Sequence, residues 1–233
     1  AQKTTRQSIA GYAGCQPENI VAGAGADELI DLICRLVLNK GDKVLTFTPT
    51  FSYYSHVVEL NSGKMVEIER DKNYNIDISV LDDKAFEGVK VVLLCSPNNP
   101  SGNLLEKEVL DFFIEKDMIV VVDEAYYEFS RNSFIDKINE HNNLIILRTF
   151  SKCFGLAGLR VGYGVMSQQL QSAIMKLKPP YSVNMAAEVA LQACLKNQKV
   201  FTAQVDEMIK TRDTTIEKLK QSDKLEVFPS CSN

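Results

Sequence analysis

The stretch "MIVVVDEAY", residues 118–126, decides the fold. Its first five residues are apolar and mostly β-branched, a composition typical of a strand that is covered on both faces. Asp123 follows at once, so a carboxylate stands where the apolar run ends. In a parallel sheet the carboxyl ends of the strands share one edge, where ligands bind. The stretch therefore predicts a buried strand that carries an acidic group to that edge.

The same pattern recurs along the chain on both sides of this stretch. Helical patterns, such as residues 25–38 and 104–117, separate many of the apolar runs. Alternation of strands and helices predicts a doubly wound, mostly parallel α/β sheet. The other continuous apolar runs cover residues 43–47, 65–69, 90–96, 143–151 and 160–166.

The last third of the chain lacks the alternation of strands and helices. Residues 183–221 have the pattern of two helices, and the second is long and charged before the strand-like run "LEVFPS", residues 225–230. We therefore divide the chain into a ligand-binding large domain, residues 1–198, and residues 199–233, a connecting helix with the first strand of a small domain. The first residue is not methionine and the last follows closely on the strand-like run, so we expect a piece of a longer protein.

Composition excludes several classes of function. The 233 residues have a formal net charge of −4 with both signs interspersed, which argues against nucleic acid or a membrane surface as a partner. No apolar run approaches the roughly 20 residues of a membrane span, and the N-terminal residues lack the apolar core of a signal peptide. Six cysteines without a CxxC pair indicate reduced, buried thiols in a cytoplasmic protein, and two isolated histidines predict no metal site.

Polar groups follow three of the predicted strands. They lie at residues 96–102, 123–126 and 149–152. Each has an ordinary explanation of its own, because "PNNPSG" is a turn composition, Asp123 can cap a helix and Lys152 can be an exposed loop lysine. Together they bring a lysine, a carboxylate and hydrogen-bond donors to one edge of the sheet.

This combination matches the needs of an electron-sink cofactor with an aldehyde and a pyridine ring. A buried lysine amine with a lowered pKa can bond covalently to an aldehyde, and Lys152 is placed to do so. A carboxylate keeps a pyridine nitrogen protonated, a role that suits Asp123. Tyr126 and Asn99 can donate hydrogen bonds to a phenolate oxygen of the ring.

The stretch "GAGADELI", residues 23–30, predicts a helix N-terminus that binds a phosphate. It is a poor dinucleotide fingerprint, because Glu28 stands where the third glycine belongs. Backbone amides at a helix N-terminus bind anions, and an ordinary helix start remains the alternative. The predicted phosphate ligands are the amides of Gly25, Ala26 and Asp27 and the side chains of Thr149, Ser151 and Arg160.

Five motifs in this order resemble the pyridoxal-phosphate-dependent aminotransferases of fold type I. They are "GAGADELI", "PTF", "SPNNPSG", "DEAYYEF" and "SKCFGLAGLRVGY", and the resemblance runs from about residue 8 to the last residue. Within that family the chain is most similar to the histidinol-phosphate aminotransferases. The lysine motif and "DEAY" are specific for the superfamily and less specific for the substrate.

The resemblance implies a role for each matching position. Lys152 would bond to pyridoxal 5'-phosphate and shuttle a proton, Asp123 would pair with the ring nitrogen, and Asn99 and Tyr126 would bond the phenolic oxygen. Phe51 would stack on the ring, with a core phenylalanine as the alternative. An upstream tyrosine and a downstream arginine of the family have no counterpart here, so we expect the chain to bind cofactor better than it turns over substrate.

The resemblance also implies the reaction and the partners. Amino transfer between glutamate and imidazole acetol phosphate, as part of histidine biosynthesis, would proceed on a homodimer with small-molecule substrates. Threonine-phosphate decarboxylase of cobalamin synthesis is the main alternative, because it resembles this family closely. An effector-sensing domain of a transcription regulator and a folded but inactive domain are the others.

Overall fold

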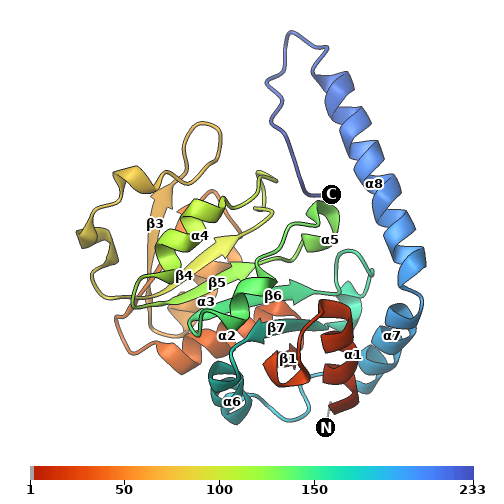
Figure 1. Cartoon of the computed structure of the whole chain (residues 1–233). Coiled ribbons are helices and arrows are strands. Elements are labelled where there is room, and N and C mark those ends of the chain that lie inside the picture. The colour runs from red at the N-terminus through yellow and green to blue at the C-terminus, as the bar shows by residue number, and fades with distance from the viewer. Residues whose placement is uncertain (1–2) are drawn as a thin grey trace.

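The computed structural model describes residues 3–233, and its centre is one seven-stranded sheet (Figure 1). The strand order is β1-β7-β6-β5-β4-β2-β3. Only β7 runs antiparallel to its neighbours, β1 and β6, so the predicted mostly parallel, doubly wound sheet is confirmed. The strands are β1 (Ile20–Gly23), β2 (Lys43–Thr48), β3 (Lys64–Glu69), β4 (Val89–Cys95), β5 (Ile119–Asp123), β6 (Leu144–Thr149) and β7 (Gly162–Met166).

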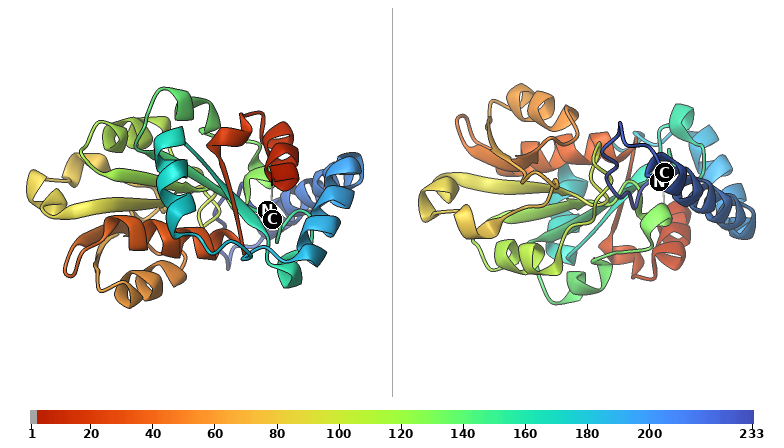
Figure 2. Two further views of the ribbon diagram at one scale, coloured as in Figure 1. Left: turned by 90° about the horizontal axis from the view of Figure 1, so that it is seen from below. Right: turned by 90° about the horizontal axis from the view of Figure 1, so that it is seen from above.

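Helices cover both faces of this sheet (Figure 2). One buried cluster joins the sheet to α2, α3 and α6, and the other joins it to α1, α4 and α7. Such two-sided cover is the reason why the central strands are continuously apolar. The helices are α1 (Lys3–Ala13), α2 (Ala26–Val37), α3 (Tyr53–Leu60), α4 (Lys107–Ile114), α5 (Tyr127–Ser130), α6 (Gln168–Leu177), α7 (Met185–Lys196) and α8 (Gln198–Leu219).

Strand β5 is the central strand that the opening stretch predicts. Val120, Val121 and Val122 are fully buried, and each contributes about 1.5–3 kcal/mol by leaving water. The register places Asp123 level with Cys95 at the end of β4 and beside Leu147 of β6. The carboxyl ends of β4, β5 and β6 therefore meet at one edge of the sheet.

Helix α2 begins at this edge. Leu29, Ile30 and Ile33 form its buried face, in keeping with the helical pattern of the sequence. Gly25 precedes the helix with φ 91°, a left-handed backbone that favours glycine. Acidic residues in the first turn, Asp27 and Glu28, complement the positive end of the helix dipole.

The C-terminal residues confirm the helices but not the strand that the sequence predicts. α8 is mostly exposed, with Val205 as its buried residue, and projects beyond the sheet (Figure 1). Residues 225–230 form no strand, because they pair with no sheet edge. Phe228 instead packs on Tyr74 with ring centroids 5.0 Å apart, and the Cys231 amide donates to the Gly102 carbonyl at 2.7 Å.

No helix in the described part of the chain is long and apolar enough to cross a membrane. Of the six thiols, Cys34 and Cys95 are buried and the other four are half-buried. The expected burial therefore holds for Cys34 and Cys95, which lie in apolar runs, and the other four thiols are only partly buried.

Candidate active site

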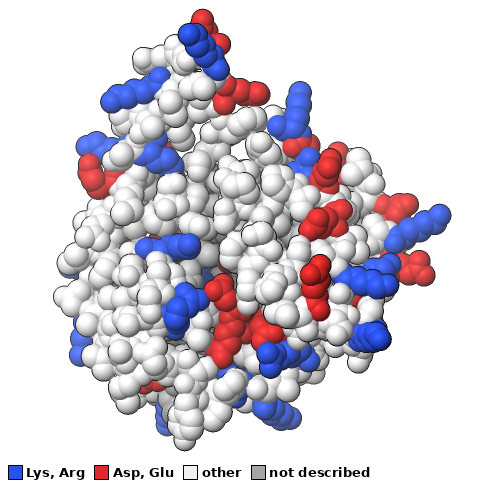
Figure 3. All heavy atoms as spheres, turned by 180° about the vertical axis from the view of Figure 1, so that it is seen from behind, with Lys and Arg blue, Asp and Glu red and all other residues white. Residues whose placement is uncertain are grey.

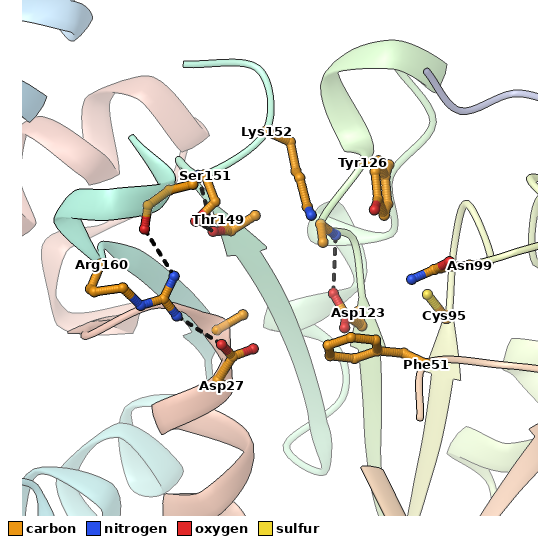
Figure 4. Close-up of a pocket in the computed structure, with 13 residues that line it drawn as sticks. Asp27, Phe51, Cys95, Asn99, Asp123, Tyr126, Thr149, Ser151, Lys152 and Arg160 are labelled. Carbon is orange, nitrogen blue, oxygen red and sulfur yellow. Dashed lines mark hydrogen bonds and ion pairs between the residues drawn. The ribbon is translucent and has the colours of Figure 1, made fainter. Parts of the chain in front are cut away.

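The three strand ends surround a cavity of about 180 Å³ (Figure 4). Every residue predicted to bind the cofactor lines this cavity except Gly25, which lies directly before its helical wall. Strand-end placement, and not proximity in sequence, brings them together. The lining residues are Ala26, Asp27, Phe51, Cys95, Asn99, Asp123, Ala125, Tyr126, Thr149, Ser151, Lys152, Ala157 and Arg160.

Asp123 lines the cavity, and it is almost fully buried. The Tyr54 hydroxyl donates to Asp123 Oδ2 at 2.8 Å, and the Ala125 amide donates to Oδ1 at 3.0 Å. Burial raises the pKa of Asp123 to about 6, while these two hydrogen bonds oppose the rise. The carboxylate therefore stays mostly ionised at neutral pH and is bonded by neutral donors.

Lys152 extends into the cavity from the turn after β6 (Figure 4). Its Nζ lies 5.2 Å from the centroid of the Tyr126 ring. The sequence predicts a buried amine, but the structure leaves Lys152 exposed, so that expectation is wrong. The turn that carries it lies at the rim of the sheet, where the side chain is open to solvent on one side.

The wall opposite Asn99 and Phe51 carries the groups that are predicted to bind a phosphate. Arg160 Nη2 contacts Asp27 Oδ2 at 2.7 Å, and Ser151 points toward the same guanidinium (Figure 4). The Thr149 hydroxyl donates to Ser151 Oγ at 2.9 Å. Because a guanidinium has five N–H donors, the contact with Asp27 leaves Arg160 able to bind a second anion.

The backbone at Gly25 favours glycine. A Cβ at this position would lie 2.6 Å from Arg160 Nη2, and the positive φ adds strain for any other residue. The positive φ is the main reason why glycine suits this position, because the end of the Arg160 side chain can move away from a methyl group.

The other wall holds the aromatic and amide groups. Phe51 and Asn99 are half-buried, and the Phe51 ring meets the Tyr54 ring edge-on at 5.5 Å and 87°. Sequence reasoning missed Tyr54 and Cys95. Cys95 is the last residue of β4, so the strand-end rule could have found it, whereas Tyr54 lies within α3 and nothing in the sequence links it to Asp123.

The residues present fit a pyridine aldehyde that carries a phosphate. A buried carboxylate with neutral partners suits a cationic ring nitrogen, and an amine stands across the cavity from it. The helix N-terminus and Arg160 suit a dianion at the other end. Tyr126 and Asn99 lie on the side of Asp123 that is away from Arg160, where a phenolic oxygen would need donors (Figure 4).

A doubly wound sheet with a lysine, a buried carboxylate and a helix N-terminus around one cavity is the arrangement expected of a cofactor-binding α/β enzyme. The family model "aminotransferase class I and II" matches residues 1–233. The chain therefore belongs to the class I and II aminotransferase family.

Two curated relatives of the chain are histidinol-phosphate aminotransferases. The chain is 38% identical over 232 residues to the histidinol-phosphate aminotransferase of Dehalococcoides mccartyi strain CBDB1, covering 100% of this chain and 65% of that protein. It is 40% identical to histidinol-phosphate aminotransferase 2 of Archaeoglobus fulgidus, covering 98% of this chain and 66% of that protein. The chain thus spans slightly less than two thirds of the length of these relatives.

Solved structures confirm the fold. Histidinol-phosphate aminotransferase of Sinorhizobium meliloti in complex with pyridoxal-5'-phosphate matches with TM-score 0.89 and 27% identity, covering 100% of this chain and 65% of that chain. The enzyme of the same name from Clostridium acetobutylicum matches with TM-score 0.87 and 29% identity, over 98% and 70%. L-threonine-O-3-phosphate decarboxylase of Porphyromonas gingivalis matches with TM-score 0.84 over 99% and 69%, but at 24% identity it shows the fold alone.

Proposed function

We propose that the chain binds pyridoxal 5'-phosphate and carries out transamination between histidinol phosphate and 2-oxoglutarate, giving imidazole acetol phosphate and glutamate reversibly. The observation that carries the proposal is the single cavity that holds Lys152, Asp123 and the N-terminus of α2. The names of the relatives at 38% and 40% identity support the choice of substrate.

Asp123 would hold the proton on the ring nitrogen at one end of the cavity. When bound, the cofactor draws off the electron pair that is released as a Cα–H bond of the substrate breaks. Tyr126 and Asn99 would donate to the phenolic oxygen, and Phe51 would pack on the ring face. These groups follow the ends of β2, β4 and β5, so the sheet holds them in place.

The phosphate would bind at the other end. The amides of Gly25, Ala26 and Asp27 supply donors at the positive end of α2, and Arg160 supplies the cation. Thr149 and Ser151 would add hydroxyl donors. The ion pair between Arg160 and Asp27 keeps the guanidinium against the helix N-terminus.

Lys152 would transfer the proton. Its amine would hold the cofactor and, when free, would take the proton from the substrate Cα and deliver it to the C4′ carbon of the cofactor. Its exposed position in the unliganded chain leaves it accessible to the cofactor and the substrate. Transfer in two half-reactions predicts ping-pong kinetics.

A homodimer is part of the proposal. Tyr181, Met185 and Val189 are 85%, 74% and 63% exposed, and Met185 and Val189 lie one helical turn apart on α7. An exposed apolar patch of this kind is typical of a surface that a partner covers. A second copy of the chain is the partner we propose.

The experiment is a pair of product assays on the protein expressed from its complete reading frame, supplied with pyridoxal phosphate. Histidinol phosphate with 2-oxoglutarate should yield glutamate, while threonine phosphate should release no carbon dioxide above background. Carbon dioxide without glutamate would replace the transaminase by the decarboxylase. Neither product, with cofactor bound, would favour a sensor or inactive domain.

A further inference from the structure

Tyr54 lies behind the cavity and contacts two of its walls. It occupies the first turn of α3 and is 1% exposed. Its hydroxyl donates to Asp123 Oδ2 at 2.8 Å, and its ring meets the Phe51 ring edge-on at 5.5 Å. One side chain outside the cavity thus contacts the group proposed for the ring nitrogen, Asp123, and the group proposed for the ring face, Phe51.

We propose that Tyr54 is a positioning residue that fixes the Asp123 carboxylate and the Phe51 ring for a protonated pyridine. The role of Tyr54 toward the cofactor rests on the proposed function, whereas its effect on the Asp123 carboxyl can be measured in the unliganded chain. The opposite oxygen, Oδ1, accepts from the Ala125 amide at 3.0 Å. Because each oxygen is anchored by one donor, the carboxylate plane cannot rotate freely, and its remaining lone pairs are left for a ligand in the cavity.

The direction of the hydrogen bond makes Tyr54 more than a packing residue. Burial raises the pKa of the Tyr54 phenol well above its usual range, so the hydroxyl keeps its proton and donates it. A bond donated to a carboxylate favours the ionised form. Removing the hydroxyl would leave Oδ2 buried without this donor and would shift Asp123 toward its neutral form.

Other groups around Asp123 do not replace this donor. Asp27 and Glu124 both act in the same direction as burial, since negative charges disfavour a further negative charge. The Cys95 thiol, level with Asp123 on β4, has a pKa raised to about 12 and is neutral at physiological pH. The titratable groups that face or share the cavity with Asp123 are Asp27 of α2, Tyr54 of α3, Cys95 of β4, Glu124 and Tyr126 after β5, Lys152 after β6 and Arg160 before β7.

The first test compares Tyr54→Phe with Tyr53→Phe in the full chain. Tyr53 is the matched control because it is adjacent, and its ring also lies beside Phe51, at 6.0 Å. With ¹³C-labelled aspartate, NMR titration of the unliganded chain should show the Asp123 midpoint about one pH unit higher in Tyr54→Phe and unchanged in Tyr53→Phe. An unchanged midpoint in Tyr54→Phe would overturn the proposal.

The second test is a double-mutant cycle on cofactor affinity. Tyr54→Phe should weaken binding of pyridoxal phosphate at pH 7.5 about tenfold in the wild-type background and less than twofold in the Asp123→Asn background. Equal losses in both backgrounds would show that Tyr54 acts through packing alone and would contradict the proposal. Failure of the wild-type chain to bind the cofactor would count against the proposed function and leave the titration test intact.

A third measurement tests the proposal if the Tyr54→Phe variant does not fold. In the unmodified chain with ¹³C at tyrosine Cζ, the Tyr54 signal should move with the midpoint of the Asp123 carboxyl, because the shared hydrogen bond changes when the carboxyl is protonated. A Tyr54 signal that stays constant through that titration would overturn the proposal.

Discussion

The two ends of the cavity are built differently. The ring end, Asp123 with Tyr54 and Cys95, is at most 5% exposed. The phosphate end, Asp27 with Ser151 and Arg160, is open, and the side chains of Arg160 and Asp27 are 45% and 43% exposed. Charges at a buried site interact strongly and titrate abnormally, whereas charges at an open site are screened by water. The ring end should therefore dominate both the chemistry and the pH behaviour.

The largest effect is expected from removing the carboxylate of the ring end. In the protein expressed from its complete reading frame, Asp123→Ala should lower the kcat of the proposed transamination by about 10²–10³-fold, the cost typical of losing one preorganised electrostatic partner in a buried site. Steady-state kinetics with saturating cofactor measure this loss. The exposed Asp136→Ala is the control and should keep wild-type kinetics. A loss of kcat below tenfold in Asp123→Ala would show that the ring end does not dominate the chemistry.

The second prediction concerns stability against pH. The pKa of Asp123 is raised to about 6 in the folded chain from 3.8, so the folded state binds more protons between these values and stability falls as pH rises through this window. The unliganded wild-type chain should lose about 2–3 kcal/mol between pH 4 and pH 7 relative to Asp123→Asn. Urea unfolding of both proteins at a series of pH values measures the difference. Parallel curves would mean that Asp123 titrates normally.

The third prediction concerns the backbone at the phosphate end. Gly25→Ala should destabilise the chain by about 1–2 kcal/mol, because Gly25 has φ 91° and a Cβ there would meet Arg160. Gly158→Ala is the matched control, since a Cβ at Gly158 meets nothing within 4 Å. Thermal unfolding of the two variants provides the comparison. Equal melting temperatures would show that the helix N-terminus adapts to a side chain.

The smallest effect is expected from the exposed cation. Arg160→Ala should weaken pyridoxal phosphate binding about three- to tenfold at low salt, and the loss should shrink as salt is added, because exposed ion pairs are screened. Arg35, which pairs with Asp31 on the outer surface of α2, is the control. Cofactor titrations at two ionic strengths measure the effect. A loss that does not depend on salt would place Arg160 in the same category as the buried ring end.

The sequence predicts the fold and the site to different degrees. Continuous apolar strands and the polar residues at their ends identify the parallel sheet and bring Asp123, Thr149 and Lys152 to one edge, because strand direction alone fixes that edge. The strand expected at residues 225–230 is absent in the described chain, since an apolar run needs a neighbouring edge that the sequence does not reveal.

Contacts between elements that are far apart in the sequence could not be predicted. Tyr54 and Asp123 are 69 positions apart, and their hydrogen bond depends on how α3 packs on β5. The exposure of Lys152 likewise depends on the path of the turn after β6, which its neighbours in sequence do not determine. Residue type at a strand end predicts which groups meet, and packing decides how deeply each is buried.

The most direct test of the central claim is to locate the covalent attachment of the cofactor. The chain is incubated with pyridoxal phosphate, reduced with borohydride, digested and mapped by mass spectrometry, with free phosphate added in a parallel sample as competitor. The account predicts one phosphopyridoxyl group per chain, on Lys152, and less labelling when phosphate competes. Labelling spread over surface lysines, or confined to a lysine outside the cavity, would contradict it.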